Sequence, residues 1–263
     1  MTLQQPTIRQ GAKAWMMGDI VIVDTLLSLS MGVFFYLYYG RKRRKIKILL
    51  HMPHTKLRLP KIFYKGLLID NNELNKYNLM MSDVGVDELF KGIKAHKIQP
   101  KYSRLYCDVE KFKDDNLEIM SKYGQGVIYT HTFNQIRFHE HDEKYKRKIF
   151  KYYNQYHKKL DRLVKRLLKK DDTLLIIDCH SYSDKLASQF ETGPFPDICI
   201  GVEENYYDQE ILDSIILKIK ELGYTYEINF PYKGSIIPNI VYNGKVKGKV
   251  ISIMLETNKR IYL

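Results

Sequence analysis

Three apolar runs in this 263-residue chain end in side chains that can bind a metal or move a proton. The run IKILLHM is followed by His54, TLLIID by His180, and VISIML by Glu256. If these runs are parallel strands of one sheet, the three side chains meet at its carboxyl edge, where ligands of such sheets bind. Two histidines with a nearby carboxylate form the ligand set of a zinc site that keeps one position open for water. We therefore predict a zinc centre at this edge.

The prediction rests on the joint pattern, because a lone histidine after a strand is more often a hydrogen-bonded structural residue. Asp178 and Ser181 flank His180, and Asn258 follows Glu256 by two positions. A further carboxylate is needed to complete the catalytic set.

The segments around these side chains alternate between strand-like and helix-like patterns. We expect strands at residues 46–52, 126–130, 173–180, 196–201, 224–232 and 250–258, and helices at 83–90, 144–170 and 209–222. The longest helix should bury one stripe, formed by Ile149, Phe150, Tyr153, Leu160, Leu163, Val164 and Leu167. Strands that alternate with helices predict an α/β fold, with a mixed, mostly parallel sheet and helices on both faces.

Residues 46–263 are expected to form one catalytic domain, because a chain of this length with 44% hydrophobic residues can bury one full core. Residues 1–45 are expected to be an N-terminal extension or a membrane anchor.

A marginal membrane segment lies within that extension. Residues 20–40 are almost long enough to span a bilayer but carry Asp24 near their start. The basic residues 41–45 follow and would hold the rest of the chain in the cytoplasm. An anchor, with membrane contact through residues 20–47, and a simple appendage both stay open. A cytoplasmic catalytic domain is expected in either case.

The charge of the chain is a weaker guide to its partners. The net charge is +13 and the pI is near 9.4, but the abundance of Lys, Ile, Tyr and Asn indicates an overall compositional bias. Much of the positive charge lies in residues 41–47 and 144–170. The second stretch is interpreted as a surface helix with a solvated basic face, and the alternative is a nucleic-acid or phosphate track. We expect no nucleic-acid partner.

Three cysteines, Cys107, Cys179 and Cys199, form no CxxC pair. An odd number of cysteines on apolar stretches does not indicate a disulfide framework, so a reducing compartment fits best. Buried packing is the expected role of each.

Nine short motifs follow one another between residues 46 and 263. They are PHTKLRLP (53–60), SDVGVDELF (82–90), SRLYCDVEKF (103–112), NQIRF (134–138), YNQYHKKL (153–160), IIDCHSYS (176–183), PDICIG (196–201), INFPYKGSIIP (228–238) and IMLETNKRIYL (253–263). Their wording and order resemble the N-formylglutamate amidohydrolase, or N-formylglutamate deformylase, family. Members of this family look like zinc carboxypeptidases in fold, so the resemblance implies a phosphorylase/hydrolase-like α/β architecture.

The resemblance also implies a set of zinc ligands. His54 and His180 are two of them, and a carboxylate at Asp83 is the expected third. The carboxypeptidase pattern usually has a Glu three residues after the first His, but this chain has Leu57 there. The third ligand must come from elsewhere, and Asp83 and Asp87 are the candidates. Helix capping and first-turn charge are the structural alternative for both aspartates.

By the same resemblance, Glu256 is the general base that takes a proton from the attacking water and passes it to the leaving amine. Zinc lowers the pKa of its water toward about 7. A semi-buried carboxylate can have its own pKa raised into the range useful for moving that proton. The alternative is a structural ion pair between Glu256 and Lys259 or Arg260.

An acylated acidic amino acid carries carboxylates, which an arginine binds bidentately with better geometry than a lysine. Arg104 and Arg137 fit this task, and Arg104 is alternatively expected to polarise the scissile carbonyl as a catalytic residue. Asp108 would orient one of the arginines. Asn229 and Tyr232 would supply neutral hydrogen bonds at the pocket wall.

The expected reaction is zinc-dependent hydrolysis of the formyl, or another short acyl, amide of an acidic amino acid. Conversion of N-formylglutamate to glutamate and formate in histidine degradation is the leading case. A deacylase or peptidase of the same fold that acts on another acyl amino acid is the nearest alternative. From a different class, the chain would be a catalytically inactive basic protein whose residues 41–47 meet anionic lipid. The presence of His54, His180 and Glu256 together argues against this last reading.

A chain shortened to begin near Lys45 is expected to be soluble and as active as the full-length protein, because no proposed site residue precedes His54. Turnover of N-formylglutamate and circular dichroism of both forms would check this. Loss of folding in the shortened chain would show that the first segment belongs to the core.

Overall fold

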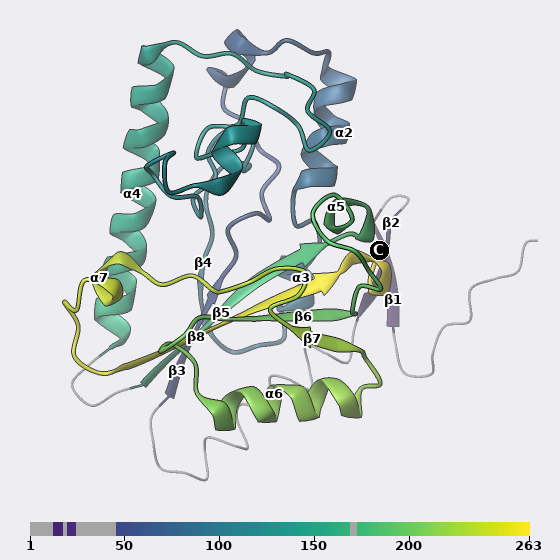
Figure 1. Cartoon of the computed structure of the whole chain (residues 1–263), viewed down its shortest axis with the longest axis vertical. Coiled ribbons are helices and arrows are strands. Elements are labelled where there is room, and N and C mark those ends of the chain that lie inside the picture. Colours follow the sequence, from purple (N-terminus) through teal and green to yellow (C-terminus); the bar gives the residue numbers. More distant parts are fainter. Residues whose placement is uncertain (1–12, 18–19, 25–45, 169–172) are drawn as a thin grey trace, which may run out of the picture.

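The computed structural model describes residues 13–17, 20–24, 46–168 and 173–263, and is built around a six-stranded sheet (Figure 1). The strand order is β4-β3-β5-β8-β6-β7. The strands are β3 (Ile46–His51), β4 (His96–Ile98), β5 (Thr173–Tyr182), β6 (Ile198–Val202), β7 (Tyr226–Ile228) and β8 (Lys249–Asn258). Only the pair of β6 with β8 is antiparallel among the neighbours in this sheet. The predicted mixed, mostly parallel sheet is confirmed.

Helices cover both faces of the sheet, as the alternation of elements predicts. The helices of the described residues are α2 (Asn71–Met81), α3 (Val86–Leu89), α4 (Glu143–Leu167), α5 (Asp184–Ala187), α6 (Gln209–Glu221) and α7 (Asn239–Tyr242), with 3-10 turns η1 (Phe63–Gly66), η2 (Ile119–Tyr123) and η3 (Lys259–Ile261), and α3, α4 and α6 are those that cover the faces. The buried side chains of α4 pack with Leu49, Leu174 and Ile176 on one face of the sheet. Helices α3 and α6 lie on the other face (Figure 1). Their buried side chains pack there with the alternate strand residues.

Helix α4 follows from its sequence almost residue by residue. Asp142 caps its first turn by accepting a hydrogen bond from the Tyr145 backbone N–H at 2.6 Å, and Lys165 and Arg166 occupy its last turn. The predicted apolar stripe is buried, with Phe150 only partly so. The helix ends at Leu167, and residues 169–170 of the predicted span lie outside the described residues.

The two longest strands, β5 and β8, pair in parallel along their whole length at the centre of the sheet. Every residue from Leu174 to Tyr182 and from Val250 to Asn258 is buried. A strand that is covered on both faces has no polar face, which is why both appear in the sequence as continuous apolar runs.

Two expected strands differ from the structure. Residues 126–130 are not a strand: Thr130 N–H donates back to the Gly124 carbonyl at 2.8 Å, and only an isolated bridge joins Gln125 to Tyr129. Val127 and Tyr129 are buried on the α4 side. The apolar pattern of residues 126–130 therefore indicated burial of these side chains and not a β-strand. The expected strand at 224–232 contracts to β7, because Asn229 adopts a positive φ of 56° directly after it.

Helix α2 and strand β4 are among the elements missing from the sequence prediction. Helix α2 is capped by Asp70, whose carboxylate accepts from Asn72 and Glu73 N–H at 2.7 and 2.9 Å. This capping signal was available in the sequence, but the apolar periodicity behind it is weak. Strand β4 is a three-residue edge strand, which is too short to give a periodic pattern. Together with the loops before α4, α2 lies beyond the carboxyl ends of β5 and β8 (Figure 1).

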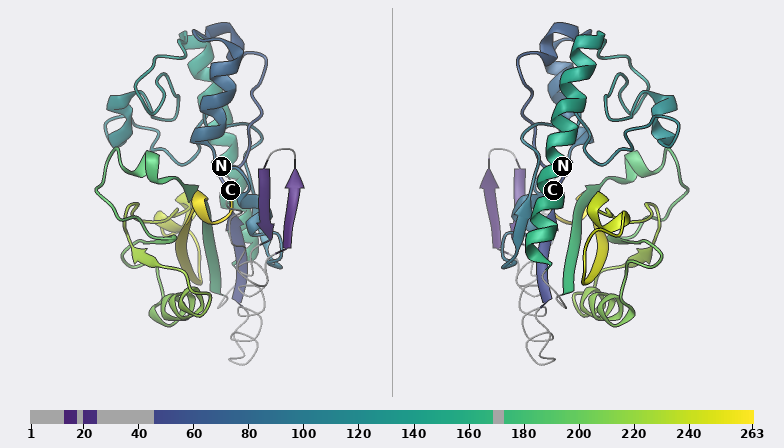
Figure 2. Two further views of the ribbon diagram at one scale, coloured as in Figure 1. Left: turned by 90° about the vertical axis from the view of Figure 1, so that its right-hand side faces the viewer. Right: turned by 90° about the vertical axis from the view of Figure 1, so that its left-hand side faces the viewer.

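The N-terminal part is described only as two antiparallel strands, β1 (Lys13–Met17) and β2 (Ile20–Asp24), which form a sheet of their own (Figure 2). Strand β2 takes up the first residues of the marginal membrane segment at 20–40. The remainder of that segment and the basic residues 41–45 lie outside the described residues. Within the described part of the chain, no helix is long and apolar enough to cross a membrane. The cysteines are free and buried, as expected.

Candidate active site

Strand register brings four polar side chains to one face of the sheet at its carboxyl edge. His51 on β3 lies opposite Asp178 on β5, and His180 on β5 lies opposite Glu256 on β8. Residues paired across neighbouring strands point to the same face, as do residues two positions apart along one strand. All four side chains therefore continue the α4 face of the sheet, and all are buried.

His54 and Asp83 complete the cluster from loops. Asp83 N–H donates to the His54 carbonyl at 3.0 Å, which joins the segment after α2 to the loop after β3. The same segment is held from the C-terminal end of the chain. Lys259 Nζ donates to the carbonyls of Ser82 at 2.7 Å and Met80 at 3.3 Å.

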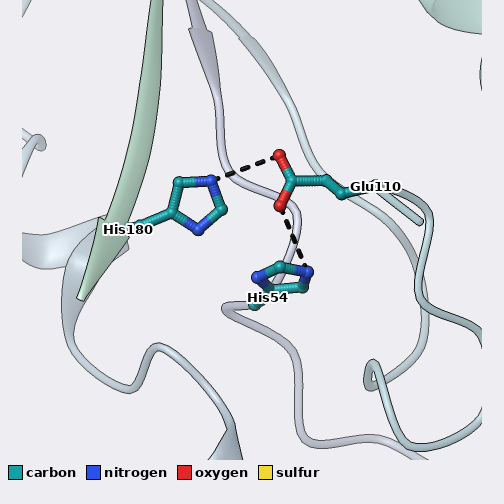
Figure 3. Close-up of side chains that lie close together, drawn as sticks. All are labelled: His54, Glu110 and His180. Carbon is teal, nitrogen blue, oxygen red and sulfur yellow. Dashed lines mark hydrogen bonds and ion pairs between the residues drawn. The ribbon is translucent and has the colours of Figure 1, made fainter. Parts of the chain in front are cut away.

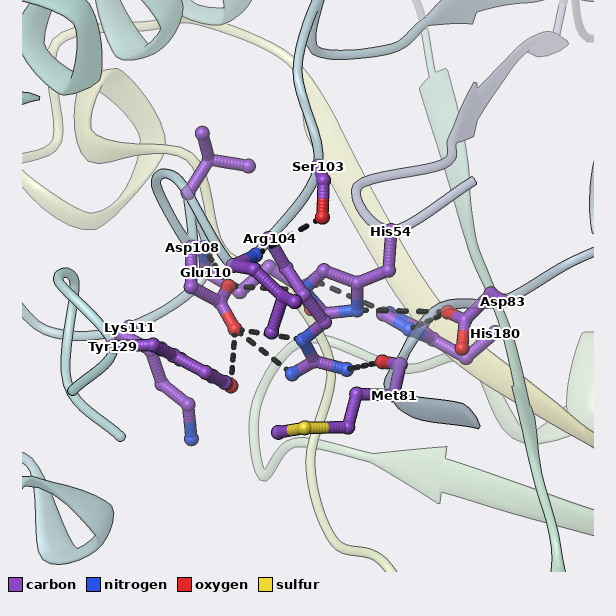
Figure 4. A network of polar contacts seen from close by, with 12 residues as sticks. His54, Met81, Asp83, Ser103, Arg104, Asp108, Glu110, Lys111, Tyr129 and His180 are labelled. Atoms are coloured by element: carbon purple, nitrogen blue, oxygen red, sulfur yellow. Dashed lines mark hydrogen bonds and ion pairs between the residues drawn. The ribbon is translucent and has the colours of Figure 1, made fainter. Parts of the chain in front are cut away.

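The Nδ1 atoms of the two predicted ligand histidines converge on one carboxylate oxygen. His180 Nδ1 lies 3.0 Å from Asp83 Oδ2, and His54 Nδ1 lies 3.5 Å from the same oxygen (Figure 4). The two imidazole centroids are 5.1 Å apart. His54 Nδ1 is buried and has no hydrogen-bond partner. The structure thus brings together the three residues expected as ligands.

The Nε2 atoms of the same histidines face a second group of carboxylates. His54 Nε2 lies 2.9 Å from Asp108 Oδ1 and 3.4 Å from Glu110 Oε2. His180 Nε2 lies 3.1 Å from Asp178 Oδ1. It also lies 3.2 Å from Glu110 Oε1, and Figure 3 shows Glu110 in contact with both imidazoles. His54 and His180 therefore both face Glu110 with Nε2 and Asp83 with Nδ1.

Sequence reasoning missed Glu110 and His51. Glu110 lies in a loop, two residues after Asp108 in the SRLYCDVEKF motif, and no strand end marks it. His51 is the last residue of β3, and its Nδ1 lies 2.7 Å from Asp178 Oδ1. Its place at the end of an apolar run was a usable signal, identical to the one that singled out His180.

Two groups of these donors could hold a metal ion. Donor atoms of His54, Glu110 and His180 all lie within 4.8 Å of one another, and the same holds for His51, Glu110 and Asp178. Imidazole nitrogen and carboxylate oxygen are ligands of zinc. The unpartnered, buried Nδ1 of His54 is the atom that a metal would satisfy.

The imidazoles of His54 and His180 and the carboxylates that face them stabilise each other's charged forms. Burial alone would lower the pKa of His54 and of His180, but the facing carboxylates outweigh it and raise both pKa values, that of His180 well above its usual range. Burial would raise the pKa of Asp83, yet its hydrogen bond to His180 and the nearby His54 imidazole hold that pKa below its usual value. A metal that binds here would release the protons that the imidazoles otherwise carry.

Asp108 is the hub of a further buried network (Figure 4). Its Oδ2 accepts from Arg104 Nε at 3.1 Å, Arg104 Nη2 at 2.8 Å and the Tyr129 hydroxyl at 2.8 Å. Arg104 Nη1 donates to the Met81 carbonyl at 3.2 Å. Asp108 therefore orients both Arg104 and, through Oδ1, the imidazole of His54.

Glu256 differs from the other carboxylates because it has no cationic partner in the described part of the chain. Its Oε2 is buried and without a hydrogen-bond partner, and burial raises its pKa to about 7. Lys259 is bound to backbone carbonyls, and Arg260 pairs with Asp184 and Asp197. Neither forms the ion pair that was the structural alternative for Glu256.

The residues predicted to bind substrate are placed unevenly. Tyr232 is partly buried, and burial together with nearby Glu256 raises its pKa. The side chain of Arg137 is 60% exposed and pairs with Glu140 at 3.6 Å, so the structure does not bring it against the histidines. Asn229 Oδ1 accepts from the N–H groups of Val202 and Gly234, which fixes its own loop.

A mostly parallel α/β sheet with buried histidines and carboxylates at its carboxyl edge defines an α/β hydrolase-like protein whose site could hold a metal ion. The family model described as N-formylglutamate amidohydrolase matches residues 46–263. The chain belongs to this family, whose name denotes hydrolysis of an amide. Searches of curated proteins and of solved structures found no match.

Replacement of Asp108 by Asn is expected to lower the free energy of unfolding by about 3–5 kcal/mol, because it leaves the largely buried Arg104 without its countercharge. Urea unfolding would measure the loss. Asp87→Asn is the control, since the Asp87–Lys56 pair is more than a third exposed and should contribute less than about 1 kcal/mol. Equal losses in the two variants would contradict a structural role for the Asp108 network.

Proposed function

We propose that the chain is a zinc-dependent amidohydrolase that removes the formyl, or another short acyl, group from an acidic amino acid. Conversion of N-formylglutamate to glutamate and formate is the leading case, with cytoplasmic histidine degradation as its setting. Membership of the family supports the reaction class. The observation that carries the proposal is the unpartnered Nδ1 of His54, which faces Asp83 in a cluster that also holds the unpartnered carboxylate of Glu256.

Two sets of donors compete for the metal, and we favour His54, Asp83 and His180 through the Nδ1 atoms. The Nε2 atom of each histidine already has a close carboxylate partner, Asp108 for His54 and Asp178 for His180. Histidines that bind metals commonly donate their other ring N–H to such a carboxylate, which fixes the tautomer and the ring orientation.

The surroundings of Asp83 support the same choice. Tyr232 and Lys259 both lie within the electrostatic reach of Asp83, Glu256 and Arg104. We infer from these charges that Glu256, Arg104 and Tyr232 lie near Asp83. On the opposite side, Glu110 Oε1 lies 3.5 Å from His51 Nδ1, which itself lies 2.7 Å from Asp178 Oδ1.

Zinc held by these three residues would polarise the substrate carbonyl and make the attacking water more acidic. Glu256 would accept the proton of that water and pass it to the leaving amine nitrogen. A carboxylate whose pKa is near 7 can both accept and release a proton at neutral pH. Since Oε2 has no other partner, it is free to take this proton.

Arg104 retains donors for a substrate. Arginine has five N–H groups, and the contacts to Asp108 and Met81 use three of them. We propose that the remaining N–H groups, with the Tyr232 hydroxyl, bind the substrate carbonyl or its α-carboxylate. Arg137 is proposed for the outer carboxylate of the substrate, which would have to displace Glu140 from it, and Asn229 for a neutral hydrogen bond at the pocket wall.

The first test compares metal content. Wild-type protein and Glu110→Gln, prepared without chelator, are expected to carry about one zinc per chain, whereas Asp83→Asn and His180→Ala should carry much less. Metal analysis of the four proteins in parallel would measure this. Retention of zinc by Asp83→Asn with its loss from Glu110→Gln would move the metal to the Nε2 side. Zinc near zero in the wild type as well as in His180→Ala would contradict the metal proposal.

The second test separates catalysis from metal binding. Glu256→Gln keeps the size of the side chain but removes the proton acceptor, so turnover of N-formylglutamate should fall by about 10²–10⁴-fold while zinc is retained. Glu227→Gln, a change at an exposed glutamate of β7, is the control and should leave turnover unchanged. Near-wild-type turnover in Glu256→Gln would remove Glu256 from the mechanism, and loss of zinc would recast it as a ligand.

A further inference from the structure

The outer side of α4 carries a hollow that the proposed reaction does not use. Its volume is about 640 Å³. Four cationic side chains line it, Lys113, Arg147, Lys151 and Lys158, together with the partly buried ring of Phe150. None of these residues belongs to the histidine and carboxylate cluster.

The cations from the helix form one row. Arg147, Lys151 and Lys158 are separated by four and then seven residues, and Asn154 fills the remaining position of the same row. At 3.6 residues per turn this spacing places all four on one side of the helix. With a rise of 1.5 Å per residue, the row is about 16 Å long.

The charge in the hollow is unbalanced. No carboxylate lines it, and within the described part of the chain none forms an ion pair with Arg147, Lys151 or Lys158. The acids near the row in sequence have other partners: Glu143 pairs with Lys146 at 2.8 Å, Asp161 accepts from the Ile240 N–H at 3.1 Å, and Asp114 accepts from Asn116. Like charges that surround one concave surface raise the local concentration of anions.

The loop opposite the row is held in place by α4 itself. The Tyr153 hydroxyl donates to the Lys111 carbonyl at 2.8 Å, and His157 Nε2 donates to the Val109 carbonyl at 2.8 Å. These bonds fix the loop, so that Lys113 Nζ lies 5.9 Å from the centre of the Phe150 ring. A loop whose backbone is already in position loses less entropy when a ligand binds.

We propose that this hollow is a second binding site, separate from the proposed active site, for a small polyphosphate ligand such as a nucleoside triphosphate. Arg147, Lys151, Lys158 and Lys113 would bind the phosphate groups through charge-assisted hydrogen bonds. The amides of Asn154 and Gln155 and the ring of Phe150 provide the neutral part of the lining. A small ligand is favoured over a nucleic-acid track because the cations gather round one hollow, which the loop at Lys113 bounds on one side.

The test is calorimetric titration of the full-length protein with ATP and with inorganic tripolyphosphate at physiological salt. Wild-type protein is expected to bind at one saturable site. The double variant Lys151→Glu and Lys158→Glu should bind at least about tenfold more weakly, because two charge-assisted contacts become repulsive. The matched control is Lys148→Glu with Lys159→Glu, which reverses the same number of charges at exposed positions of α4 that do not line the hollow. The control should bind like the wild type.

Three results would overturn the proposal. They are the absence of saturable binding of both probes, an equal loss of affinity in the two double variants, and binding confined to oligonucleotides with an affinity that rises with their length. The last would indicate a nucleic-acid track along α4. Circular dichroism would check the fold of each variant, and Lys151→Gln with Lys158→Gln would replace the glutamate pair if that pair failed to fold.

Discussion

The parallel pairing of β5 with β8 is the constraint on which the rest of the site depends. It places His180 directly opposite Glu256 and makes both strands end at the same edge of the sheet. Because the pleat has a period of two, a shift of one residue in this register would turn Glu256 to the α6 face, away from His180. The complete burial of both strands specifies the register, since such a shift would also exchange the residues that pack against α4 and α6.

A buried cluster of histidines and carboxylates is stable only if its charges are paired and hydrogen-bonded. Here both ring nitrogens of His54 and of His180 lie within 3.5 Å of a carboxylate oxygen, and Asp108 is shared between His54 and Arg104. Three buried atoms of the cluster nevertheless have no hydrogen-bond partner: His51 Nε2, His54 Nδ1 and Glu256 Oε2, and burial raises the pKa of Glu256 to about 7. Buried polar atoms without a hydrogen-bond partner are expected at functional sites. Glu256, the residue proposed to move the proton, carries such an atom.

Helix α4 contributes to the active site with its inner side and to the proposed polyphosphate site with its outer side. Its inner side supplies apolar residues to the core and, through Tyr153 and His157, anchors the loop that carries Asp108 and Glu110. Its outer side carries the row of cations around the hollow at Lys113. The same helix and the same loop therefore build the carboxylate side of the active site and the proposed polyphosphate site, with the backbone of the loop between them.

The sequence by itself determined the parts that depend on local pattern. Continuous apolar runs predicted β3, β5 and β8, helical spacing predicted α4, and polar residues at strand ends singled out His54, His180 and Glu256. The apolar content of residues 126–130 led to a wrong prediction of a strand, because these residues are buried without forming one. Tertiary structure decided which nitrogen of each histidine faces which carboxylate. Glu110 faces the histidines only because its loop is tied to α4, and Asp83 does so only because its segment is bonded to His54 and Lys259. These contacts join residues far apart in the chain, and local sequence pattern carries no information on them.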